Sequence, residues 1–158
     1  MPAQPDDFGI LARQALAAAV GSPRTLPALV AGLGDVSGRL LRELAPVLGS
    51  LGVRAIMSRA LKLATARRPY LSRVAVFEEG YEATSVLREK GDDAFEEVRD
   101  AFEDLLVTFL GILAGLVGRG LAGRLAAEAL AGPGPAGPES SGPSVSSNRG
   151  REDEEGPR

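Results

Sequence analysis

The sequence predicts an all-α fold, in which residues 1–131 form a single bundle-like domain of about five or six helices around a long central helix at about residues 93–118. Three observations predict this class. Apolar residues recur at helical spacing, Pro and Gly divide the chain into segments of helix length, and the composition changes abruptly after Leu130. Residues 132–158 are rich in Gly, Pro and Ser with an acidic cluster near the end, which predicts a disordered tail.

The N-terminal part is predicted to contain three short helices, at residues 6–20, 26–33 and 35–44. Asp6, Thr25 and Asp35 are the expected N-caps. Between and within the last two helices lie three glycines, Gly32, Gly34 and Gly38. They resemble a dinucleotide-binding turn, but the spacing departs from the strict motif and no suitably placed acid follows, so a helix end and a loop are the favoured interpretation.

The middle of the chain is predicted to hold a basic amphipathic helix that Pro69 ends, with Val53, Ile56, Met57 and Ala60 on its apolar face. The cluster from Val74 to Phe77 then favours one short extended segment or hairpin near residues 73–78. Short helices are expected at residues 82–89 and, after the central helix, at residues 121–130.

The central helix has the clearest pattern. Asp93 as N-cap and Glu96 three residues later predict a capping box. A stripe of apolar residues follows at steps of three and four: Phe95, Val98, Phe102, Leu105, Phe109, Ile112 and Leu116. No charge occurs in residues 105–118, so this half is predicted to be buried nearly all round, with Gly111 and Gly115 allowing a neighbouring helix to approach closely.

Charge is distributed unevenly along the chain. Between Glu43 and Glu78 there is no acid but there are six cations, whereas residues 78–104 contain eleven acids and three bases. Either the basic region at residues 54–73 binds an anionic surface, or it pairs with the acidic segment. The six candidate binding residues are Arg54, Arg59, Lys62, Arg67, Arg68 and Arg73.

The absence of cysteine and histidine excludes several kinds of chemistry. No disulfide, Cys or His zinc site, Cys nucleophile or Ser-His-Asp triad can be built. The carboxylates match no metal-binding motif, so we predict no catalytic residue, metal or cofactor. The uncharged run at residues 105–118 is shorter than the ~20 residues of a membrane span, and the net charge of -3 does not predict a nucleic-acid binder.

These observations favour a non-enzymatic interaction or regulatory module, whose partner is another protein or a second copy joined through the apolar stripe. One alternative is a small-ligand-binding protein or an enzyme that uses Arg, Asp, Glu, Ser or Tyr. Another is peripheral membrane or nucleic-acid binding through residues 54–73. No Lys or Arg precedes Arg13, which predicts a cytoplasmic protein, and the preference for Arg over Lys is typical of GC-rich bacterial genomes.

Overall fold

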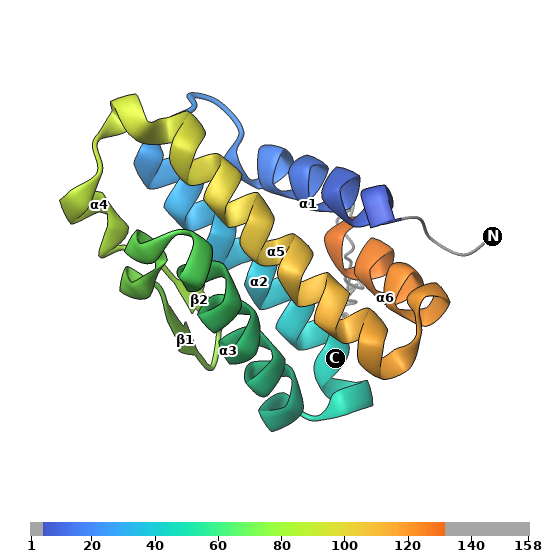
Figure 1. Cartoon of the computed structure of the whole chain (residues 1–158). Helices are drawn as coiled ribbons and strands as arrows, with labels where there is room; N and C mark the ends of the chain where they lie inside the picture. The colour runs from blue at the N-terminus through green and yellow to red at the C-terminus, as the bar shows by residue number, and fades with distance from the viewer. Residues whose placement is uncertain (1–4, 132–158) are drawn as a thin grey trace, which may run out of the picture.

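Helices account for most of residues 5–131, which are the residues that the computed structural model describes (Figure 1). The all-α prediction is confirmed, while the predicted disordered tail at residues 132–158 lies outside the described residues. Within residues 5–131 the α-helices are α1 (Pro5–Val20), α2 (Leu26–Leu48), α3 (Ser50–Arg67), α4 (Val86–Glu89), α5 (Phe95–Val117) and α6 (Arg119–Ala131). Two 3₁₀ segments, η1 (Pro69–Arg73) and η2 (Asp92–Ala94), and one hairpin, β1 (Ala75–Phe77) with β2 (Gly80–Glu82), complete the fold.

Helix α5 is the centre of the bundle, as its apolar stripe predicts. It packs against α1, α2, α3 and α6, and it crosses the whole molecule in Figure 1. Phe102 and Phe109 on this helix are among the largest fully buried side chains. Since Phe95, Val98 and Leu105 are also buried in the chain's own core, most of the stripe is covered by its own domain and not by a second copy.

The capping box predicted for α5 is wrong. The turn η2 precedes the helix, Ala94 occupies the N-cap position, and no side chain caps it. The neighbouring Asp92 instead accepts a hydrogen bond of 2.9 Å from the backbone N–H of Leu26. Its carboxylate therefore satisfies a free donor in the first turn of α2, a tertiary contact that local sequence does not reveal.

The prediction that the second half of α5 is buried nearly all round is also wrong. Gly111, Gly115 and Leu116 are exposed, and a Cβ added at either glycine would meet no atom within 4 Å. Leu106 and Leu113 on other sides of α5 are fully buried, whereas the glycine side is open. Gly111 and Gly115 therefore do not serve close packing within the described residues.

Replacing Gly111 by alanine is expected to stabilise the protein by about 0.5–1 kcal/mol, because alanine restricts the unfolded chain and favours the helix without meeting a neighbour. Thermal unfolding followed by circular dichroism measures the change. Gly38→Ala is the matched control, since its new Cβ would lie 2.8 Å from the carbonyl oxygen of Glu79. A lower melting temperature for Gly111→Ala would show that the site is not open.

The three short helices predicted for the N-terminal part become two long ones. The first, α1, agrees with the prediction, but α2 continues through all three glycines and through Pro46 before it ends at Gly49, where φ is 81°. Its glycines lie in mid-helix and not in a turn before a helix, so both the loop and the nucleotide interpretations are wrong. The burial of nine α2 side chains outweighs the low helix propensity of glycine.

Tertiary packing explains why glycine stands at these positions. A Cβ at Gly32 would lie 3.2 Å from Val20 of α1, and one at Gly38 would lie 2.8 Å from the carbonyl oxygen of Glu79 in the hairpin. The glycines thus let α1 and the hairpin approach the backbone of α2. In the hairpin, Gly80 lies equally close to the backbone of α2 at Gly38, and its φ is 124°.

The hairpin confirms the extended segment predicted near residues 73–78, and its antiparallel partner β2 supplies the missing second strand. The buried Ser37 hydroxyl of α2 accepts a hydrogen bond of 2.8 Å from the Tyr81 backbone N–H and donates one of 2.8 Å to the Leu33 carbonyl. The Tyr81 hydroxyl donates to the Met57 carbonyl of α3 at 2.7 Å, and burial raises the pKa of this hydroxyl. The hairpin is therefore fastened to both α2 and α3.

Helices α3 and α6 agree with their predicted positions, although α6 begins two residues earlier than predicted. Among the described residues, no helix combines the length and the apolar character that a membrane span requires.

Candidate functional site at the apolar end and the outward face of α3

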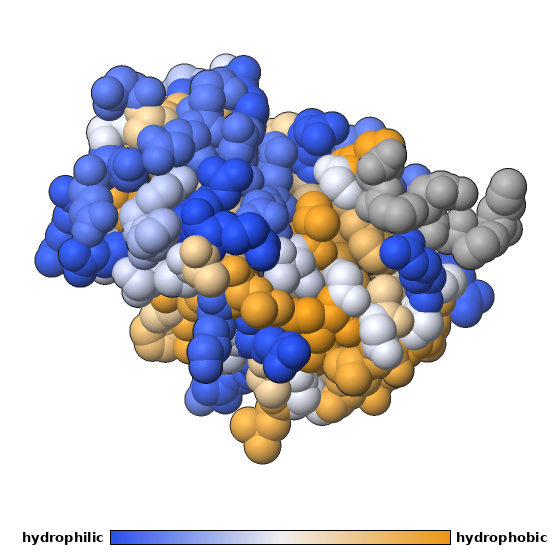
Figure 2. Space-filling view, viewed as in Figure 1, coloured by the Kyte–Doolittle hydropathy of each residue, from blue (hydrophilic) through white to orange (hydrophobic). Residues whose placement is uncertain are grey.

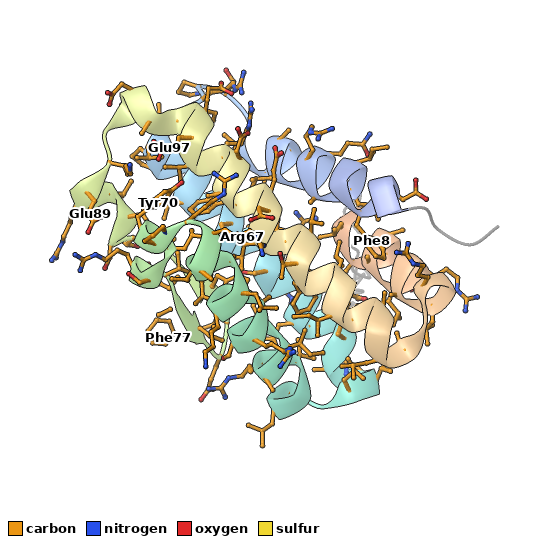
Figure 3. All side chains as sticks on the ribbon, viewed as in Figure 1. Phe8, Arg67, Tyr70, Phe77, Glu89 and Glu97 are labelled. Atoms are coloured by element: carbon orange, nitrogen blue, oxygen red, sulfur yellow. The ribbon has the colours of Figure 1, made fainter. Side chains whose placement is uncertain are left out.

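The six cations proposed from the sequence divide into two groups. Arg67, Arg68 and Arg73 contact the acidic segment, through Asp104 for the first two and Glu89 for the third. Arg67 also donates to Thr108 at 2.8 Å, so its guanidinium lies between α3 and α5 (Figure 3). For these three residues the two charged segments lie side by side, and the charges neutralise one another.

Arg54, Arg59 and Lys62 form the second group. None of them has an ion pair or a hydrogen bond with any residue in the described part of the chain. Arg59 and Lys62 are exposed, Arg54 is half-buried, and α3 contains no acidic residue. The structure therefore narrows the candidate binding surface from six cations to three.

The amphipathic pattern of α3 turns these cations outward. Val53, Ile56, Met57, Ala60 and Ala64 are buried on one side of the helix, which places Lys62 near the middle of the opposite side. Leu51 and Leu63 are exposed as well. We call the surface made by Leu51, Arg54, Arg59, Lys62 and Leu63 the outward face of α3.

Leu51 also belongs to a second surface, which we call the apolar end. Its members are exposed large hydrophobic residues beside two helix turns: Val47 (55% exposed), Leu51 (78%), Leu116 (65%) and Leu121 (37%). The first pair flanks the turn between α2 and α3, and the second pair flanks the turn between α5 and α6.

The two turns lie at the same end of the bundle because α3 and α5 run antiparallel. Arg67 near the end of α3 contacts Asp104, whereas Tyr70, further along the chain, donates a hydrogen bond to the carbonyl of Glu97, nearer the start of α5 (Figure 3). The start of α3 is therefore beside the end of α5. Figure 1 shows both turns at the lower right, and Figure 2 shows hydrophobic residues gathered over this part.

The opposite end of the molecule is hydrophilic. Figure 2 shows polar residues over α4 and the start of α5. Lys90 lies over the Tyr70 ring at 4.7 Å and pairs with Glu97 at 3.1 Å, while Arg73 pairs with Glu89. Partial burial, with a smaller contribution from the Glu97 carboxylate, raises the pKa of the Tyr70 hydroxyl. The charged side chains named here therefore pair with one another.

Sequence reasoning missed the apolar end, although two signals for it were present. Leu51 lies out of phase with the buried positions of α3, and Leu116 comes just before Gly118, the C-cap of α5. Gly49 and Gly118, with φ of 81° and 92°, reverse the chain at these turns and leave the flanking leucines without a covering element. Only the antiparallel arrangement of α3 and α5 brings the two pairs to one end.

The described residues contain no cluster of acidic side chains arranged to hold a metal ion. Comparison of the chain with protein-family models, curated proteins and solved structures found no significant match.

Proposed function

We propose that this chain is a non-enzymatic interaction module that binds another protein through its apolar end. The observation that carries the proposal is the gathering of Val47, Leu51, Leu116 and Leu121 at one end of the bundle. Single exposed hydrophobic residues are common on protein surfaces, whereas several of them at one end of a domain favour a binding surface there. When a partner covers such side chains, each Å² of apolar surface removed from water contributes about 25 cal/mol to the free energy of binding.

The neighbouring charges indicate the chemistry of the partner. Arg54, Arg59 and Lys62 follow Leu51 on α3 by about one to three helical turns, and they lack acidic partners in the described residues. A partner with an apolar patch beside acidic side chains would match both features. A second copy matches less well, because it would bring a second set of unpaired cations toward the same contact.

The proposal is tested with Leu51→Glu combined with Leu116→Glu, two changes at exposed positions that place charges on the apolar end. Affinity purification from cells that naturally express the protein is expected to recover a partner with the unchanged chain and to lose it with the double variant. Phe77→Glu is the control, because Phe77 is exposed on the hairpin, away from this end (Figure 3).

Unchanged thermal unfolding of the variants would confirm that loss of the partner is not loss of the fold. Recovery of the same partner by the double variant would contradict the proposed surface. Light scattering over a range of concentrations distinguishes a second copy from a different protein, since only self-association raises the mass of the pure chain.

A second candidate function, attachment to an anionic membrane surface, is favoured by the outward face of α3. This face combines Leu51 and Leu63 with three cations and no acid, the composition by which helices lie on anionic lipid. Sedimentation with phosphatidylglycerol vesicles, but not with phosphatidylcholine vesicles, would support it if high salt abolishes the binding. Salt-dependent binding of labelled DNA or RNA without vesicle binding would instead favour nucleic acid.

A further inference from the structure

A cleft of about 340 Å³ opens between α1, the turn that follows it, and α5. Its apolar lining includes Leu16, Val20, Leu29 and Phe95. Three arginines, Arg13, Arg24 and Arg99, also line it, and we call it the arginine cleft. No residue of the apolar end or of the outward face of α3 contributes to this cleft.

The arginines come from three different parts of the fold. Arg13 lies on α1, Arg24 lies in the turn before α2, and Arg99 lies on α5. The antiparallel packing of α1 against α5 brings them together, with Arg13 beside Glu103 and Arg24 over the Phe95 ring at 5.0 Å. Sequence reasoning did not single out these residues, because they are separated by up to 86 positions (99 minus 13).

The acidic partners in the protein leave much of the donor capacity of these arginines unused. Arg13 reaches Glu103 only at 3.6 Å, and Arg24 reaches Glu96 only at 3.5 Å. Arg99 makes close contacts with Glu96 and Asp100, and its buried Nε lies 3.5 Å from the Glu103 carboxylate without a hydrogen bond in the described part of the chain. Glu103 is the only carboxylate among the residues that line the cleft.

We propose that the arginine cleft binds a small amphipathic anion, with its apolar body against Ala17 and Val20 of α1 and its anionic group at Arg24. Guanidinium groups match the oxygen geometry of carboxylates and phosphates through paired N–H donors. The volume lies near the lower end of the ~300–1,000 Å³ range of small-molecule sites, which limits the ligand to a short apolar chain or a single ring. This site is independent of the proposed protein-binding function.

Four probes test the ligand class by isothermal titration calorimetry on the full chain. Octanoate and octyl phosphate carry an apolar chain with an anionic group, octanol lacks the charge, and acetate lacks the chain. Saturable binding of octanoate or octyl phosphate is expected, with octanol and acetate at least about tenfold weaker. Whichever of the two anions binds more tightly shows whether the site prefers a carboxylate or a phosphate. Equal binding of octanol, or no saturable binding of either anion, would overturn the proposal.

Two pairs of variants locate the site. Ala17→Leu places a larger side chain in the cleft, whereas Ala18→Leu makes the same change at an exposed position of α1 outside the lining. Arg24→Gln removes a charge from the cleft, and Arg42→Gln removes one from an exposed position of α2. We expect Ala17→Leu and Arg24→Gln to weaken binding about tenfold or more and both controls to leave it within about twofold.

Thermal unfolding without ligand verifies that each variant folds. If Ala17→Leu and Arg24→Gln bind the anion as tightly as their controls do, the anion binds elsewhere and the assignment of the cleft is wrong. Loss of a protein partner in the apolar-end variants would not alter this result, so the two proposals fail separately.

Discussion

Replacing Gly80 by alanine is expected to lower the free energy of unfolding by about 3 kcal/mol, adding two costs of about 1–3 kcal/mol each. The first is backbone strain, because φ at this residue is 124°, where side chains other than that of glycine are rarely found. The second is steric, because the new Cβ would lie 2.6 Å from the Ser37 hydroxyl oxygen and 2.9 Å from the Gly38 nitrogen.

Gly118→Ala separates these two costs. Gly118 also has a positive φ, at 92°, but a Cβ there would meet no atom within 4 Å. Urea unfolding of the two variants is expected to show a loss of about 1–2 kcal/mol for Gly118→Ala and a clearly larger loss for Gly80→Ala. Equal losses would show that the contact between the hairpin and α2 does not constrain residue 80.

Phe102→Ala is expected to lower the free energy of unfolding by about 3–5 kcal/mol, the range found when a fully buried aromatic side chain is removed and a cavity remains. Phe102 is 0% exposed and lies on α5, the helix that contacts α1, α2, α3 and α6. Since a domain of this size is stable by only about 5–15 kcal/mol, the change removes a large share of the total.

Urea unfolding of the unchanged protein and of Phe102→Ala measures this loss, provided that the free energy of unfolding falls with urea concentration at the same slope in both. Leu116→Ala is the matched control, because Leu116 belongs to the same apolar stripe but is 65% exposed. This control is expected to change stability by no more than about 0.5 kcal/mol. A loss below about 1 kcal/mol for Phe102→Ala would contradict the placement of α5 at the centre of the core.

The positions of α1, α3, α5 and α6 could be predicted from the sequence because their apolar residues recur at helical spacing. That periodicity persists whatever the helix packs against, so it places Phe102 and Phe109 in the core before any partner is known. The extended segment before Gly80 was predictable for a similar reason, since β-branched and aromatic residues cluster there.

The continuity of α2 could not be predicted in this way. Glycine disfavours helices in isolation, so Gly32, Gly34 and Gly38 indicate a break by local rules. In the fold these residues leave room for α1 and for the Glu79 carbonyl, and the surrounding burial stabilises the helix. The hydrogen bond that Asp92 accepts could not be predicted either, because its backbone partner Leu26 is 66 residues away.

The candidate site was also predicted only in part from the sequence. The sequence identified six cations in an acid-free region but contained no signal that Arg67, Arg68 and Arg73 face the acidic segment while Arg54, Arg59 and Lys62 have no described partner. Pairing depends on the register between α3 and its neighbours, which has no local signature. The arginine cleft likewise exists only where α1 crosses α5.

The sequence by itself determined the helical class, the central position of α5 and the exclusion of Cys and His chemistry, because periodicity and composition do not depend on how the helices are arranged. Only the tertiary structure decided which glycines are packed and which are open, which cations are neutralised, and that four exposed apolar residues share one end. These features depend on distances between residues far apart in the chain, which the folding of the whole domain sets.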